Sequence, residues 1–111
     1  MAQSDTPVLV LTTAPIELDA AALARALLSE QLVACVNILP VMQSHYRWQG
    51  AIESASEHQI VLKTTMARVE ELRERLTTLH PYEVPEFLVV EASGGSDAYL
   101  GWIRLEAAPP R

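Results

Sequence analysis

Cysteine, glycine and positive charge are all scarce in this chain. Cys35 is the only cysteine among 111 residues, so neither an intrachain disulfide nor a zinc site with several thiolates can form within one chain. Only eight basic side chains oppose fourteen acidic ones, which gives a formal net charge of −6. Duplex nucleic acid needs a basic face, so nucleic acid is not an expected partner. A solvated cation suits such a surface, although a charge of this size also serves solubility alone.

Signals for membrane insertion, export and common enzymatic chemistry are missing as well. No apolar run approaches the roughly 18 residues of a membrane helix. The start, Met1–Asp5, lacks the basic and apolar regions of a signal peptide. We therefore expect a cytoplasmic protein with no membrane partner. Gly94-Gly95 lacks the frame and the lysine of a phosphate-binding loop, and no Gly-x-Ser-x-Gly nucleophile elbow occurs. The sequence predicts a protein that is not an enzyme and implies no organic cofactor.

The segments that are present follow a β-α-β-β-α-β order in a single domain, residues 1–111, with an ordered core at about 7–106. Strands are predicted at residues 8–13, 35–39 continuing at 44–48, 58–64 and 87–90, with Pro40 breaking or bending the second. Helices are predicted at about 17–31 and 65–79, and a short helix follows residue 97. Gln49-Gly50 supplies the reversal of a long hairpin. The fold class is α+β, a ferredoxin-like βαββαβ sandwich with a short C-terminal helix.

Two strands are apolar at every position rather than alternately. Val8–Leu11 and Ile60–Leu62 show this pattern, which is typical of strands buried on both faces. Two helices cover only one face of a four-stranded sheet. The second face needs a cover, and another copy of the chain supplies one. We therefore expect a homo-oligomer.

A proline-rich connection, His80–Glu86, joins the second helix to the last strand, and we call it the proline clamp. Pro81 and Pro85 fix their own φ and keep the preceding residues, His80 and Val84, out of the helical region. The second helix must therefore end at the clamp. The side chains between the prolines are expected to point in preset directions.

Several further motifs lie along the chain, namely Thr13-Ala14-Pro15, Leu32 to Asn37, Ser44 to Gly50 with Tyr46 and Trp48, Leu62-Lys63-Thr64 and Tyr99-Leu100-Gly101-Trp102. In this order, and with the proline clamp before the last of them, they resemble the CutA divalent-ion-tolerance proteins over about residues 7–106. The resemblance implies a ferredoxin-like fold assembled as a homotrimer, and a role in tolerance to divalent metals, copper above all, with Cu(II) binding. Such a trimer is similar in architecture to PII signalling proteins, which bind small regulators between subunits.

His80 is the leading candidate nitrogen ligand for a divalent ion, with Glu83 as an oxygen co-ligand, because Cu(II) favours imidazole and oxygen donors. A histidine that ends a helix can instead contact the last carbonyls, and this alternative stays open. Cys35 is a third candidate, although a thiol in a buried strand usually acts as a small inert hydrophobe. Thr12 stands where some family members carry a second cysteine, which argues against a two-thiolate site. His45 and His58, on the two hairpin arms, are expected to face each other as an incidental pair.

A second hypothesis is a PII-like regulatory module that holds a small anionic metabolite in clefts between subunits. Lys63 is expected near a carboxylate such as Glu57 or Glu86, because an ammonium on a central strand is costly to bury unpaired. An intersubunit salt bridge is an equal alternative for Lys63, and packing is an alternative for the aromatic residues. A scaffold for protein contacts is a third possibility. The residues predicted to line the cleft are Tyr46, Trp48, Glu57, Lys63, Tyr82 and Glu86.

Overall fold

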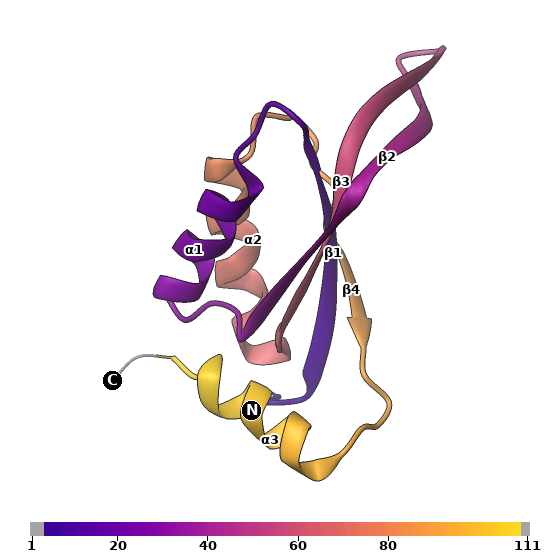
Figure 1. Ribbon diagram of the computed structural model, residues 1–111. Helices are drawn as coiled ribbons and strands as arrows, with labels where there is room; N and C mark the ends of the chain where they lie inside the picture. The colour runs from indigo at the N-terminus through magenta and orange to yellow at the C-terminus, as the bar shows by residue number, and fades with distance from the viewer. Residues whose placement is uncertain (1–3, 110–111) are drawn as a thin grey trace.

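The computed structural model describes residues 4–109, which form one antiparallel sheet and three α-helices (Figure 1). The sheet order is β2-β3-β1-β4, and each neighbouring pair is antiparallel. This arrangement confirms the predicted ferredoxin-like α+β fold. No helix in this part of the chain is long and apolar enough to cross a membrane. In chain order the elements are β1 (Pro7–Pro15), α1 (Ala20–Ser29), β2 (Cys35–Trp48), β3 (Ala51–Thr65), the 3-10 helix η1 (Met66–Arg68), α2 (Val69–Leu79), β4 (Leu88–Glu91) and α3 (Asp97–Glu106).

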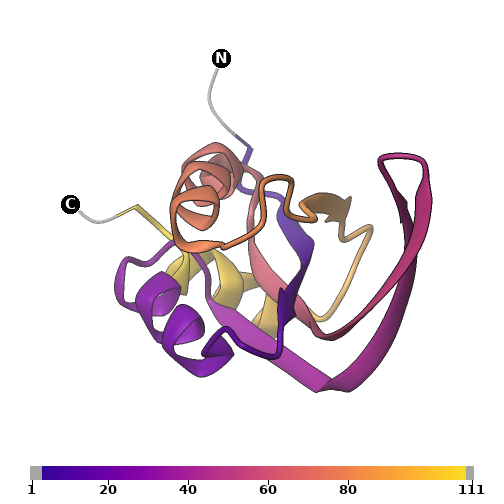
Figure 2. The same ribbon diagram turned by 90° about the horizontal axis from the view of Figure 1, so that it is seen from above.

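Helices α1 and α2 cover one face of the sheet (Figures 1 and 2). Their leucines lie at helical spacing and meet the inward side chains of β1 and β3, so this face forms the hydrophobic core. Helix α1 begins at Ala20, later than predicted, because Asp19 Oδ1 accepts the N–H of Ala22 at 3.0 Å and caps the helix there. The core side chains that are at most 1% exposed include Val8, Val10, Leu27, Leu32, Ile60, Leu62, Leu72 and Leu76.

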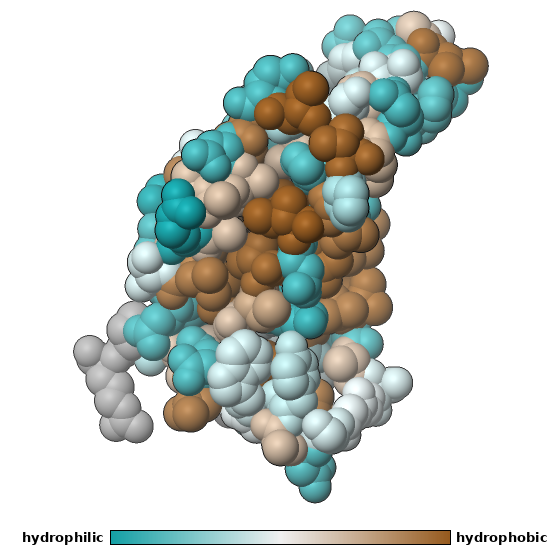
Figure 3. All heavy atoms as spheres, viewed as in Figure 1, coloured by the Kyte–Doolittle hydropathy of each residue, from teal (hydrophilic) through white to brown (hydrophobic). Residues whose placement is uncertain are grey.

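The opposite face of the sheet is also apolar. Directly opposed residues of antiparallel strands share a face, and Leu9 lies opposite Val90 while Leu11 lies opposite Leu88 and Val61. Leu88 is 56% exposed and Val90 is 46% exposed. Figure 3 shows hydrophobic side chains gathered where Figure 1 draws β1 and β4. The predicted second apolar face therefore exists, and α1 and α2 do not cover it.

The β2–β3 hairpin projects well beyond the helices (Figures 1 and 2). Gln49 and Gly50 both have positive φ, 50° and 82°, as a two-residue hairpin turn requires. Strand β2 runs through Pro40 without a break, and the pairing shifts register between Ile38 and Val41. This bulge accommodates the proline, which has no N–H to give to the ladder.

The register of the hairpin separates its two histidines. His58 lies opposite Val41, and His45 lies opposite Ser54. The prediction that they face each other is therefore wrong, because the bulge and the distance of each residue from the turn set different partners. His58 instead bonds through Nδ1 to the carbonyl oxygen of Leu39 at 2.7 Å.

Candidate functional site

The proline clamp is anchored to β1 by the imidazole of His80. Helix α2 ends at Leu79, and His80 is extended with φ −96° and ψ 138°, as the following proline requires. His80 is only 7% exposed, and its Nε2 lies 2.6 Å from the carbonyl oxygen of Thr13. Its Nδ1 accepts the backbone N–H of Tyr82 at 3.1 Å. Since Nδ1 accepts, the ring proton lies on Nε2, and the imidazole is neutral with both nitrogens engaged.

Tyr82 connects the clamp to β3. Its hydroxyl donates to Oε2 of Glu57 at 2.6 Å, and Glu57 is 5% exposed. Burial raises the pKa of the Tyr82 phenol, and the hydrogen bond to Glu57 and the charge of that carboxylate raise this pKa further. The Tyr82 ring also packs on the His80 ring, with centroids 4.8 Å apart. The start of the clamp is therefore held to both central strands.

The far end of the clamp is held by an amide. Nε2 of Gln59 donates to Oε2 of Glu86 at 2.8 Å and to the carbonyl oxygen of Thr12 at 2.7 Å. Gln59 comes from β3 and Thr12 from β1. The clamp thus forms a fixed wall against the sheet rather than a loose loop.

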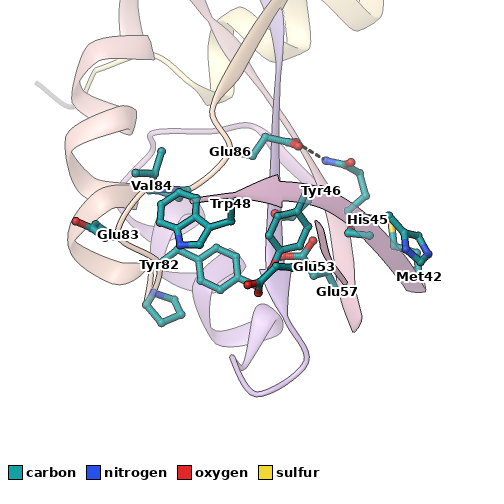
Figure 4. A pocket seen from close by; sticks show the side chains of 15 residues that line it. Met42, His45, Tyr46, Trp48, Glu53, Glu57, Tyr82, Glu83, Val84 and Glu86 are labelled. Carbon is teal, nitrogen blue, oxygen red and sulfur yellow. Dashed lines mark hydrogen bonds between the residues drawn. The ribbon is translucent and has the colours of Figure 1, made fainter. Parts of the chain in front are cut away.

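Between this wall and the hairpin lies a cavity of about 810 Å³ (Figure 4). Strand β2 contributes Tyr46 and Trp48, and β3 contributes Glu53 and Glu57. Glu83 and Glu86 of the clamp also line it, while none of its lining residues within the described chain is lysine or arginine. Carboxylates close to aromatic faces create a negative potential there. The cavity therefore favours a cation over an anion.

Five of the six residues predicted to line a cleft lie around this cavity, and the sixth does not. Lys63 lies opposite Cys35 and Leu9, on the face that α1 and α2 leave open. Its Nζ donates to the Tyr99 hydroxyl at 3.2 Å and lies 5.5 Å from the centre of that ring. The expected pairing of Lys63 with Glu57 or Glu86 is wrong within one chain, because Lys63 lies six residues beyond Glu57 along β3, a separation of about 20 Å in an extended strand. Glu86 is itself hydrogen-bonded to Gln59, two residues from Glu57 on the same strand. The five lining residues are Tyr46, Trp48, Glu57, Tyr82 and Glu86.

The residues predicted as metal ligands are not brought together within one chain. Both nitrogens of His80 already have partners, and Glu83 is an exposed residue of the clamp. Cys35 lies at the start of β2, with Sγ 3.8 Å from Oδ1 of Asn37. Between residues 4 and 109, no three His, Cys, Asp or Glu side chains are grouped as a metal site would need. A complete coordination shell would have to draw on more than one chain.

Two cavity residues, His45 and Glu53, were missed by reasoning from the sequence. For Glu53 the sequence did contain a signal. Counting outward from the Gln49-Gly50 turn pairs Trp48 with Ala51 and Tyr46 with Glu53, which places the carboxylate beside a predicted cleft residue.

Comparisons with known proteins agree with the fold. The family model of the CutA1 divalent ion tolerance protein matches residues 8–106. The divalent-cation tolerance protein CutA of Thermus thermophilus is 44% identical over 95 residues, which cover 86% of this chain and 92% of that protein. The CutA of Escherichia coli O45:K1 is 43% identical over 98 residues, 88% of each chain. The solved structure of the Thermus thermophilus protein superimposes with a TM-score of 0.87 at 42% identity, over 90% of this chain and 97% of that one. The chain belongs to the CutA1 divalent ion tolerance protein family.

Proposed function

We propose that this protein binds divalent metal ions, Cu(II) among them, as a cytoplasmic homotrimer in the response to those ions. It does so as a binding protein and not as an enzyme. Membership of a divalent-cation tolerance family supports the ion class. The observation that carries the proposal is the cavity beside the proline clamp, whose four carboxylates meet no lysine or arginine among the residues that line it.

The same observation argues against the alternative of a module for anionic metabolites. That hypothesis needed Lys63 in the cleft with Glu57 and Glu86. Lys63 instead contacts Tyr99, and an anion in the cavity would meet only carboxylates, aromatic rings and uncharged groups. Repulsion by unpaired carboxylates would oppose its binding.

The homotrimer is supported by the uncovered apolar face of the sheet. Monomeric proteins rarely expose a large contiguous apolar patch, and such patches usually mark contacts. A trimer would also bring side chains of different subunits together. That matters for metal binding because residues 4–109 of one chain do not bring three His, Cys, Asp or Glu side chains together at one point.

Among the histidines, His45 is the better nitrogen ligand. It is exposed and lines the cavity together with Glu53 and Glu83. His80 would have to release either Tyr82 or Thr13 to bind a metal ion. The set of His80, Glu83 and Cys35 remains a prediction, and it is tested against His45 in one experiment.

That experiment is a titration of metal-free protein with Cu(II), followed by calorimetry and by electron paramagnetic resonance. The parent, His45→Ala and His80→Ala are compared, with His58→Ala as the matched control on the hairpin. We expect saturable binding by the parent, and His45→Ala to lose nitrogen coupling from the spectrum. Loss of that coupling in His80→Ala alone would reverse the ligand assignment. Absence of saturable binding in the parent would refute metal binding, and fractionation of cells tests the location.

A further inference from the structure

The cavity beside the clamp combines aromatic surface with dispersed negative charge. Tyr46, Trp48 and Tyr82 come from two separate segments, β2 and the clamp, and their side chains border the same space (Figure 4). Tyr46 is 41% exposed and Trp48 is 38% exposed, so their surfaces are open to a ligand. Aromatic faces attract ammonium groups, worth about 0.5–2 kcal/mol for each well-placed contact.

Glu57 is the cavity residue that most clearly indicates a cationic ligand. It is 5% exposed, and the hydrogen bond it receives within residues 4–109 comes from the phenol of Tyr82 at Oε2. A carboxylate has about four lone-pair sites, so Glu57 keeps capacity for further donors. A neutral phenol also leaves the charge uncompensated, and a buried charge is costly unless it is paired. A cationic N–H donor in the cavity would fill a free acceptor site of Glu57 and would also compensate its negative charge.

The carboxylates are spread along the cavity instead of surrounding one point. Figure 4 shows Glu83 and Glu86 on different sides of the cavity from Glu53 and Glu57. No three such groups of the described chain are placed to share one metal ion. A single inorganic ion cannot contact all of them. A flexible chain with several separated positive charges can, and its methylene groups can pack on the aromatic rings between them.

We propose that this cavity binds a linear aliphatic polyammonium ion, a diamine or triamine, with one ammonium group on Glu57 and another on Glu83 or Glu86. Tyr46, Trp48 and Tyr82 contact the chain between the charges. This binding goes beyond the proposed metal function and does not depend on it. The ligand is recognised by separated charges, so an amine with one charge binds more weakly.

Trp48 supplies the test. The chain has two tryptophans, Trp48 and Trp102, and Trp102 lies in α3, outside the cavity lining. Trp102→Phe therefore leaves Trp48 as the only tryptophan fluorophore in the intact protein. Spermidine is titrated into this variant, with butylamine, NaCl and MgCl2 at matched ionic strength as comparisons. We expect a saturable change in Trp48 fluorescence with spermidine, and binding of butylamine weaker by about tenfold or more, as loss of a charge-assisted contact predicts.

Three variants and one control decide the site. Glu57→Gln is expected to weaken spermidine binding by about tenfold or more, and so is either Glu83→Gln or Glu86→Gln, according to which carboxylate holds the second ammonium group. Glu74→Gln on the surface of α2 makes the same chemical change outside the cavity. Circular dichroism verifies that each variant is folded, and Glu83→Gln and Glu86→Gln keep the test valid if Glu57→Gln is unstable. No saturable signal, equal affinity for butylamine, or an affinity in both Glu83→Gln and Glu86→Gln equal to that in Glu74→Gln would each overturn the proposal. The Cu(II) titration is a separate readout, so either function can fail alone.

Discussion

At the residue scale, the clamp depends on a few hydrogen bonds made by side chains that sequence reasoning had marked for other tasks. His80 was expected as a metal ligand, yet both of its nitrogens bond to backbone groups. Glu57 and Glu86 were expected beside Lys63, yet they accept from Tyr82 and Gln59. These side chains hold the clamp against the sheet. The carboxylates of Glu57 and Glu86 also line the cavity, where their other lone pairs can accept further hydrogen bonds.

His80→Ala should destabilise the protein by about 2–4 kcal/mol, because it leaves the Thr13 carbonyl and the Tyr82 N–H without their partners. The loss of buried ring volume adds to this cost. Urea unfolding measures the change, and His58→Ala, at a less buried histidine, is the control. Equal midpoints for the two variants would contradict this role of His80.

The raised pKa of Tyr82 predicts that the folded protein loses stability at alkaline pH. A phenol in the unfolded chain titrates near pH 10.0, and the pKa of Tyr82 in the folded protein is raised above that value. Between the two values the unfolded chain has lost a proton that the folded protein still holds. The stabilisation is therefore fully present below pH 10.0 and falls as the pH rises above it, by at most about 1.4 kcal/mol per pH unit.

Urea unfolding at a series of alkaline pH values measures this loss. Tyr82→Phe should remove the part of the pH dependence that comes from Tyr82, whereas Tyr99→Phe should retain it. Tyr99 lies in α3 and does not line the cavity, which makes it a control for the loss of one phenol elsewhere in the protein. An unchanged slope in Tyr82→Phe would refute the assignment.

At the scale of elements, the β2–β3 hairpin forms one side of the cavity. The turn places two consecutive residues at positive φ, of which only Gly50 is a glycine. A side chain at Gln49 makes that conformation costly, and asparagine tolerates it better. The length of the arms then carries Tyr46 and Trp48 out to face the clamp.

Gln49→Asn should therefore protect the hairpin tip from opening, whereas Gly50→Ala should favour opening by about 1 kcal/mol. No atom lies within 4 Å of a Cβ added at Gly50, so the effect comes from the backbone conformation and not from a clash. Because the tip projects beyond the core, amide hydrogen exchange near Trp48 and Ala51 is the appropriate measurement. Equal exchange rates in both variants would contradict the strained turn.

At the scale of the whole molecule, the single chain is less compact than a globular domain of its length. Its radius of gyration is 14.7 Å, against about 13 Å for a compact domain of this size. The longest extent is 43 Å, compared with 28 and 26 Å. The projecting hairpin accounts for the excess, and together with the open apolar face it gives the chain surfaces suited to contact with further copies.

Leu88→Lys should dissociate the proposed trimer, because it would bury a charge at the contact. Analytical ultracentrifugation of the parent should give a mass of three times 12.2 kDa, and the variant should give smaller species. Leu28→Lys is the control, since Leu28 is an exposed leucine, 40% exposed, on α1. A monomeric parent would refute the trimer, and an unchanged trimer in Leu88→Lys would move the contact elsewhere.

Local features of the sequence were sufficient to predict the order of the elements, the hairpin turn and the end of α2. Prolines, a Gln-Gly turn and apolar periodicity act on neighbouring residues, so they can be read without a structure. Val8–Leu11 also predicted two apolar faces correctly, because successive side chains of a strand point to opposite sides.

Only the tertiary structure decided which side chains meet around the cavity. The bulge beside Pro40 sets the register that separates His45 from His58. The clamp packs so that Tyr82 bonds to Glu57, whereas Lys63, six residues farther along β3, bonds to Tyr99 of α3. These partnerships join residues distant in the chain, and a shift of one residue in register would exchange them. By itself, the sequence determined the fold and its family motifs, while long-range packing decided that the cavity is acidic, aromatic and free of lysine.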